Sequence, residues 1–201
     1  MEVFVFAVFA LAALASAVGI DNWQAELHPG DKIARLESLK QEGRKILMVG
    51  DGLNKSELET NPVLAEYVIH DLNSDPRLPF PDNHFDAVVN TVSVDYLTQP
   101  LEVFREVSRV LKPDGLFIVV FSNRMFPPKA VNIWKRSTEK QRTELVRRFF
   151  TLSGRFAIEG YHESTGKPRP KDDKYYEPGI PSDPIYAVWG KPTRKSADSL
   201  H

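Results

Sequence analysis

The sequence predicts an α/β fold: a doubly wound, mostly parallel sheet that ends in an antiparallel pair of strands. Three short apolar runs, residues 45–49, 85–90 and 116–121, are separated by stretches with helical periodicity, and the centre of each run is continuously apolar rather than alternating. Strands of that kind are typical of a parallel sheet that helices cover on both faces. We therefore expect a Rossmann-like domain in which ligands bind beyond the carboxyl ends of the strands.

The remaining elements of the parallel part follow in order along the chain. Apolar residues at three-to-four spacing predict a surface helix within residues 23–43, and Asn54 is expected to cap a short helix after the first apolar run. Residues 66–70 are expected to form the next strand. Residues 112–115, Lys-Pro-Asp-Gly, are expected to end a helix over residues 100–111. The apolar face of that helix is expected to consist of Leu101, Phe104, Val107 and Leu111.

The pattern changes in the last third of the chain. Helices are predicted near residues 129–135 and 139–150, and residues 156–161 and 185–189 are interpreted as strands that pair antiparallel. Between these strands, residues 163–184 are rich in proline, glycine and charge. This excursion is interpreted either as a lid over a binding site or as a disordered insertion, and both interpretations stay open.

The chain divides into an apolar N-terminal segment, residues 1–20, one domain, residues 21–191, and a polar tail, residues 192–201, that is expected to be disordered. Ala15-Ser16-Ala17 has the small-x-small form of a signal-peptide cleavage site, but Glu2 stands where such signals carry positive charge. Residues 1–20 are therefore either a signal peptide or membrane anchor, or a buried helix or gene-prediction artefact. In the second case the protein is expected in the cytoplasm or an organelle.

Composition narrows the classes of ligand. A chain of 201 residues with 42% hydrophobic content suits one globular domain, and a formal net charge of -1 gives no general attraction to nucleic acid. A small-molecule ligand fits this balance better than a polyanion. The sequence has no cysteine, and its five histidines lack the short spacings of a metal site, so no metal is expected. The oligomeric state is not predicted.

Polar and small residues follow the predicted strands. Glycines allow a ligand to approach the backbone closely, a carboxylate accepts hydrogen bonds from amino groups, and an amide both donates and accepts. Each residue type also favours turns and helix caps for local reasons. Because several such segments fall on the same edge of the predicted sheet, we interpret them together as a ligand site. Its candidate residues are Gly50, Asp51, Gly52, Asn54, Asp71, Leu72 and Asn90.

Residues 71–122 carry a family resemblance. The stretches DLNSDPRLPFPDNHFDAVV and LEVFREVSRVLKPDGLFIVVFSN resemble the centre of type 11 methyltransferases, which are class I enzymes dependent on S-adenosylmethionine (SAM). That family has an Asp-Leu pair, an LPF-x-D-x-x-FD signature and a helix ending in RVLKPGG, where this chain has Asp114 in place of the first glycine. FSNRMFPPKAVNIW and Asp183-Pro184 are similar to an uncharacterised branch from plants, algae and bacteria.

The resemblance implies SAM as cofactor and an order of strands. The first strand is expected to end in a glycine-rich loop, the second in an acidic residue for the ribose, and the third in Asp71 for adenine. Too few residues separate Gly50 from Leu78 to hold a first strand, its helix and a second strand. Gly50 is therefore expected to end the second strand, with Asp51 or Asn54 near the ribose, and the first strand and its loop are not recognisable upstream.

Two functions follow as hypotheses. The first is a SAM-dependent methyltransferase for a small-molecule acceptor; the second is a non-catalytic relative that binds or scaffolds without a complete SAM loop. Methyl transfer needs alignment more than acid–base chemistry, so no catalytic residue is assigned. Tyr96, His162 and Asp95 are candidate bases by chemistry alone, and each also reads as a core or surface residue. Lys55 occupies the third glycine position of a dinucleotide fingerprint, which argues against hydride transfer.

Overall fold

The computed structural model describes residues 45–50, 68–169, 171 and 176–193. The predicted helix within residues 23–43, the helix capped by Asn54 and residues 1–20 lie outside this part of the chain. Within the described ranges, no helix is both long enough and apolar enough to cross a membrane.

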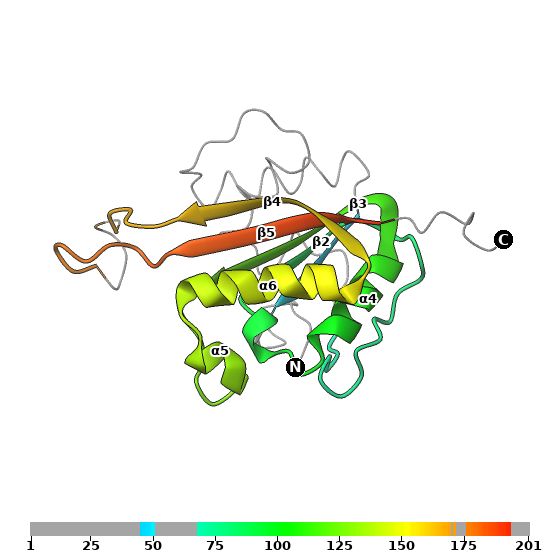
Figure 1. The fold of residues 1–201 in the computed structure, drawn as a ribbon, viewed down its shortest axis with the longest axis horizontal. Helices are drawn as coiled ribbons and strands as arrows, with labels where there is room; N and C mark the ends of the chain where they lie inside the picture. Colours follow the sequence, from blue (N-terminus) through cyan, green and yellow to red (C-terminus); the bar gives the residue numbers. More distant parts are fainter. Residues whose placement is uncertain (1–44, 51–67, 170, 172–175, 194–201) are drawn as a thin grey trace.

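The described strands form one mixed sheet. They are β1 (Ile46–Gly50), β2 (Phe85–Thr91), β3 (Leu111–Ser122), β4 (Phe156–Ser164) and β5 (Ile185–Pro192), in the order β1-β2-β3-β5-β4. The strands β1, β2 and β3 run parallel, whereas β5 is antiparallel to both β3 and β4 (Figure 1). The predicted α/β fold, with a parallel part followed by an antiparallel pair, is confirmed.

The helices of the described chain are α4 (Pro100–Val110), α5 (Asn132–Arg136) and α6 (Glu139–Ser153), with a short 3-10 helix, η1 (Val94–Tyr96). Figure 1 shows α4 and α6 next to each other on one face of the sheet, with α6 along β4 and β5. A capping box fixes the start of α6: the Thr138 side chain accepts from the Gln141 N–H, and the Gln141 side chain accepts from the Thr138 N–H.

Aromatic side chains form the core between these helices and the sheet. Phe104 of α4 contacts Phe117 of β3 and Phe150 of α6 in edge-to-face geometry, with ring centroids 4.8 and 5.1 Å apart. Ile118, which points to the opposite face from Phe117, is also fully buried. Both faces of β3 are therefore covered, as the continuous apolar run predicted. Of the predicted helix face, Phe104 and Val107 are buried.

The junction between α4 and β3 differs from the prediction. Leu111, predicted as the last residue of the helix face, is the first residue of β3 and pairs with Phe85. The sheet register then shifts, so that Ala87 pairs with Leu116. Residues 112–115 thus form a bulge inside the strand rather than a loop after the helix. The core face of α4 is completed instead by Val103 and Val110.

Two predictions about the parallel part are wrong. Residues 68–70, the described part of the strand predicted at 66–70, have no regular structure. The strand β1 is hydrogen-bonded directly to β2, which corresponds to the fourth strand of the family. In a doubly wound sheet the neighbour of the fourth strand is the first strand, not the second. The spacing argument required room for a helix and a further strand between Gly50 and Leu78, and the described part of that interval, residues 68–78, contains no strand.

Candidate functional site

The carboxyl ends of β1 and β2 lie together at one edge of the sheet, hereafter the C-terminal edge. Gly50, the last residue of β1, pairs with Thr91, the last residue of β2, and Thr91 pairs with Val120 of β3. Gly50 and Asn90 are therefore brought together, as predicted. The candidates Asp51, Gly52 and Asn54 follow Gly50 in the chain and lie outside the described residues.

Asn90 is the most unusual polar residue at this edge. Its side chain is only 2% exposed, and its register partners Val49 and Val119 place it on the same face of the sheet as those core valines. Among the described residues, the side-chain oxygen Oδ1 has no hydrogen-bond partner. A buried acceptor without a donor costs about 1–3 kcal/mol, so such groups usually have a specific role. Asn90 presents an acceptor that a ligand can satisfy.

Val92, two residues later, carries backbone strain. Its φ angle is 44°, and its side chain is 49% exposed. For a β-branched residue this left-handed conformation costs about 1–2 kcal/mol. Its N–H donates to the carbonyl of Val120 at 2.9 Å, which holds the turn in place. Strain of this kind concentrates at functional sites. The sequence carries no signal for Val92, because valine is among the residues least expected in that conformation.

The segment from Asp71 to Asn73 forms a tight turn at the same edge. The exposed Asp71 carboxylate accepts from the Asn73 N–H at 3.0 Å and, through its other oxygen, from the Ser74 hydroxyl at 2.7 Å. Leu72 is fully buried in the core. Each oxygen of Asp71, the predicted adenine partner, thus already accepts one bond within its own turn.

Asn73 attaches this turn to the segment that follows β2. Its Nδ2 donates to the carbonyl of Tyr96 at 3.0 Å, and its Oδ1 accepts from both the N–H and the hydroxyl of Thr98 at 2.8 and 3.0 Å. Sequence reasoning placed Asn73 in a strand-end loop without assigning it this task. The Asp71 turn and the end of β2 are thereby held as one unit.

The three candidate bases are not brought together. The Tyr96 hydroxyl accepts from the Phe126 N–H at 2.9 Å, and the carbonyl of Asp95 accepts from the Val131 N–H at 2.9 Å. Both residues are buried, and they fasten the segment after β3 to η1. His162 lies in β4, which the strand order separates from β2 by β3 and β5.

The excursion between β4 and β5 is tied to the end of β3. Arg124, just after β3, forms an ion pair with Oδ2 of Asp183 at 2.8 Å, and Arg169 of the excursion approaches the same oxygen at 3.2 Å. A β-bridge between Pro168 and Pro181 closes the base of the excursion. The base of this segment therefore lies near the carboxyl end of β3. That it acts as a lid stays a prediction.

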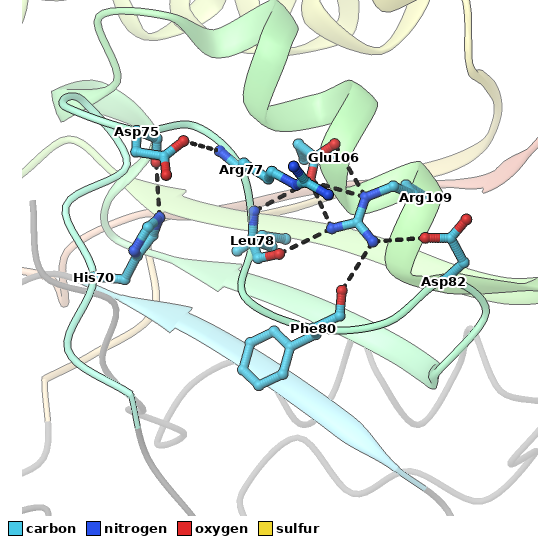
Figure 2. Close-up of polar contacts among 8 residues, drawn as sticks. All are labelled: His70, Asp75, Arg77, Leu78, Phe80, Asp82, Glu106 and Arg109. Atoms are coloured by element: carbon cyan, nitrogen blue, oxygen red, sulfur yellow. Dashed lines mark hydrogen bonds and ion pairs between the residues drawn. The ribbon is translucent and has the colours of Figure 1, made fainter.

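The signature that carried the family resemblance lies at the opposite, N-terminal edge of the sheet, and Figure 2 shows its contacts. Arg109 of α4 donates to the carbonyls of Leu78 and Phe80 at 2.9 and 2.8 Å and pairs with Asp82 at 2.7 Å and Glu106 at 2.7 Å. Glu106 also accepts from the Leu78 N–H at 3.1 Å. The signature is thereby folded back against α4.

The last aspartate of the signature joins three strands. Asp86 of β2 forms an ion pair with Lys112 at 2.8 Å, and its other carboxylate oxygen accepts from the Lys45 N–H at 2.8 Å, just before β1. These contacts hold the starts of β1, β2 and β3 together. The signature therefore stabilises the fold at this edge. Among the described residues, no cluster of three or more His, Asp or Glu side chains is arranged to hold a metal ion.

The fold is similar to that of a solved methyltransferase. In a complex of the Haloferax volcanii Trm112 methyltransferase activator with a putative methyltransferase, the matching chain is 18% identical; the likeness covers 92% of this chain and 91% of that one, with a TM-score of 0.52. A putative methyltransferase from Bacillus halodurans is 16% identical over 82% of this chain and 100% of its own, with a TM-score of 0.47. The fold comparison rests on the first.

Short stretches of the chain match proteins of other descriptions. Nitrogen fixation protein FixI of Bradyrhizobium diazoefficiens is 53% identical over 45 residues, which is 22% of this chain. Copper-transporting ATPase 2 of Mus musculus is 44% identical over 54 residues, or 27% of this chain. The matches span only 6% and 3% of the lengths of those proteins.

A longer match covers the parallel part of the sheet. Residues 5–119 match the family described as methyltransferase domain, and this range includes β1, β2, α4 and most of β3. It spans more than half of the chain and includes the whole signature that the Arg109 network holds. Together with the mixed α/β sheet, it shows that this chain belongs to the methyltransferase domain family.

Proposed function

We propose that the protein binds SAM at the C-terminal edge of its sheet and transfers the methyl group to a small-molecule acceptor. The observation that carries the proposal is the Asn90 carboxamide, which is buried at this edge and whose Oδ1 finds no partner in the described part of the chain. SAM offers an ammonium group and ribose hydroxyls as donors for such an oxygen. Gly50 lies one register position away and brings backbone without a side chain to the same place.

Methyl transfer from SAM depends on the position of the acceptor. SAM supplies an activated sulfonium leaving group, so the protein has to align the acceptor rather than generate a strong nucleophile. The rigid turn made by Asp71 and Asn73, fastened to the end of β2, suits a positioning role. The small net charge of the chain supports a small acceptor rather than nucleic acid.

Calorimetry with S-adenosylhomocysteine tests the proposal. The wild-type chain is expected to bind, and Asn90→Leu is expected to weaken binding about tenfold, equivalent to the loss of about 1.4 kcal/mol. Asp71→Ala is expected to weaken binding as well, whereas Asp71→Asn retains an acceptor for the Asn73 N–H. Asn132→Ala, at an exposed position of α5, serves as the control. No binding at millimolar ligand would contradict the proposal.

A non-catalytic relative is the second candidate. It is favoured by the turn at Asp71, whose two oxygens already accept bonds from Asn73 and Ser74. Incubation with SAM labelled in its methyl group and an extract of small metabolites separates the two candidates. Label in a metabolite establishes catalysis, whereas ligand binding without label transfer in any fraction favours the non-catalytic candidate. Loss of membrane association on removal of residues 1–20 would identify either one as membrane-tethered.

A further inference from the structure

Tyr96 contacts both sides of the candidate site. Its main-chain carbonyl accepts from Asn73 Nδ2 at 3.0 Å, and its hydroxyl accepts from the Phe126 N–H at 2.9 Å. We infer that Tyr96 is a positioning residue for methyl transfer: it fixes the connecting segment between β3 and α5, residues 123–131, at the edge where the acceptor meets the cofactor. The inference rests on the proposed function, because the bound cofactor reinforces this attachment.

On the cofactor side, Asn73 connects the turn at Asp71 to η1. Its N–H donates to the Asp71 carboxylate at 3.0 Å, and its side chain bonds the Tyr96 carbonyl and both the N–H and the hydroxyl of Thr98. Its own carbonyl accepts from Gln99 Nε2 at 3.1 Å. The turn cannot move away from η1 unless these hydrogen bonds break, so a ligand that fixes the turn also fixes η1.

The element between the two sides is buried. All three residues of η1, Val94, Asp95 and Tyr96, lie in the interior, and Tyr96 is 8% exposed. Protein interiors are close-packed and transmit displacement rather than absorb it. A short buried helix with hydrogen bonds on two sides therefore passes the position of the Asp71 turn to the connecting segment.

The connecting segment contains a stiff turn. Phe126 is followed by Pro127 and Pro128, whose rings fix φ and which have no N–H. The Phe126 carbonyl accepts from the N–H groups of Lys129 and Ala130 at 2.9 and 3.0 Å, which closes the turn. Residues 126–130 therefore move as one piece, and the attachment of Phe126 decides where that piece lies.

This turn carries a ring that an acceptor can contact. The Phe126 side chain is 63% exposed, the largest value among the exposed large apolar side chains of the described residues. Methyl transfer needs the acceptor atom in line with the sulfonium, and a ring on a fixed backbone serves as a surface for alignment. Tyr96, a candidate base by chemistry alone, thus acts through Phe126.

Two hydrogen bonds between η1 and the connecting segment differ in kind. The Val131 N–H donates to the main-chain carbonyl of Asp95 at 2.9 Å, whereas the Phe126 N–H donates to the side-chain hydroxyl of Tyr96. A substitution at Tyr96 can remove the second bond and leave the first. Each amide exchanges its hydrogen when its bond opens, and a ligand that binds the assembled site opposes that opening.

Hydrogen exchange tests the inference, followed for single amides by NMR on the full chain with and without saturating S-adenosylhomocysteine. Tyr96→Phe removes the hydroxyl and keeps the ring and the main chain. Asn73→Ala removes the side-chain bonds between the Asp71 turn and η1. Tyr186→Phe is the matched control, since it removes the hydroxyl of another buried tyrosine, whose partner is Glu139 of α6.

In the wild type, S-adenosylhomocysteine should slow exchange at the Phe126 and Val131 amides about fivefold. Tyr96→Phe should abolish the ligand-dependent slowing at Phe126 and retain it at Val131, whereas Asn73→Ala should abolish it at both. Tyr186→Phe should behave as the wild type does. A merely structural role for Tyr96 predicts no ligand dependence at Phe126. That result in the wild type, or retained slowing at Phe126 in Tyr96→Phe, would overturn the inference.

Calorimetry on the same preparations separates this inference from the proposed function. Tyr96→Phe should keep the affinity for S-adenosylhomocysteine within about threefold of the wild type, because Asn90, the Asp71 turn and the Tyr96 carbonyl are unchanged. If the wild type binds S-adenosylhomocysteine but exchange at Phe126 does not respond, only the inference about Tyr96 fails. If the wild type does not bind it, the proposed function fails, and the positioning role fails with it.

Discussion

The two edges of the parallel sheet differ in how completely their polar groups are satisfied. At the N-terminal edge, Arg109 and Asp86 bind backbone and side-chain partners from several elements. At the C-terminal edge, Asn90 has a buried oxygen to which no described residue donates, and Val92 has a strained backbone. The residues that identify the family therefore stabilise the fold, whereas the polar group that can still accept a hydrogen bond from a ligand lies at the other edge.

The largest effect on stability is expected from Arg109→Met. The change removes donors from two backbone carbonyls and leaves the partly buried Glu106 without its main partner. We expect a loss of about 3 kcal/mol in the free energy of unfolding, measured by urea denaturation. Arg147→Met, which removes an exposed pair at 3.8 Å, should cost less than about 0.5 kcal/mol. Equal losses in the two variants would mean that the contacts of Arg109 at the N-terminal edge stabilise the fold no more than an exposed ion pair does.

Gly115→Ala probes the bulge at the N-terminal edge. A Cβ atom there would lie 2.9 Å from both the Lys112 carbonyl oxygen and the Leu111 Cδ2, and 3.1 Å from the Asp86 carbonyl oxygen. Because two of these atoms are backbone, the strand has to shift, and we expect a loss of about 2 kcal/mol. Gly154→Ala, which meets open space at a positive φ, should cost about 1 kcal/mol. A thermal melt of each variant ranks the two.

Asn90→Leu tests the opposite edge. Replacing a buried carboxamide whose Oδ1 has no partner among the described residues with an apolar side chain of similar size should leave the free energy of unfolding within about 1 kcal/mol of the wild type or raise it. The same variant should lose about tenfold in affinity for S-adenosylhomocysteine. Stability is measured by denaturation and affinity by calorimetry on one preparation. A large loss of stability would show that Asn90 supports the fold, as the residues of the other edge do.

Val92→Asn sharpens the comparison further. Asparagine tolerates the left-handed conformation better than a β-branched residue, and the position is half exposed. We expect stability to rise by about 0.5–1 kcal/mol. Val120→Ala, at the partner strand, is expected to lower stability, because that side chain is buried. A fall in stability on Val92→Asn would show that the left-handed backbone at Val92 does not destabilise the wild-type protein.

The smallest effect concerns two tyrosines on the α6 side of the antiparallel pair. Burial and Glu163 raise the pKa of Tyr161 to about 12, and burial and the hydrogen bond to Glu139 raise the pKa of Tyr186 beyond its usual range. At least two of the six tyrosines should therefore ionise late in an absorbance titration. Both hydroxyls have hydrogen-bond partners, so this region resembles the N-terminal edge, where the polar groups also have partners.

The sign of the linked stability follows from the raised pKa. The folded protein holds these protons more tightly than the unfolded chain, whose tyrosines titrate near pH 10. The stabilisation is full below about pH 10 and is lost as the pH rises through the raised values, about 12 for Tyr161. Tyr161→Phe and Tyr186→Phe should each remove one late ionisation. A single step for all tyrosines would contradict the assignment.

The sequence predicted those elements whose pattern is local and continuous. The apolar runs of β2 and β3, the antiparallel pair of β4 and β5, and the burial of Phe104 and Val107 were all readable. The place of β1 in the sheet was not predicted, because the pairing of β1 with β2 depends on contacts between residues distant in sequence, which a count of residues between two motifs does not reveal.

The candidate site was predicted only in outline. Gly50 and Asn90 do meet at one edge, since the ends of neighbouring parallel strands must. Arg109 was missed as the hub of the signature because a charged residue on a helix ordinarily faces solvent. Val92 was missed because its conformation opposes its propensity. Asn73 was seen as a turn residue, and its bonds to Thr98 depend on contacts distant in sequence.

The direct junction of α4 and β3 has an evolutionary consequence. Because the helix ends at Val110 and the strand begins at Leu111, the bulge at residues 112–115 is all that separates the helix from the regular part of β3. A change of one residue in length within residues 116–122 would move every following side chain of β3 to the opposite face of the sheet. Relatives should therefore keep the length of this part of β3 constant, and vary freely in length beyond the bridge between Pro168 and Pro181, where the base of the excursion is closed.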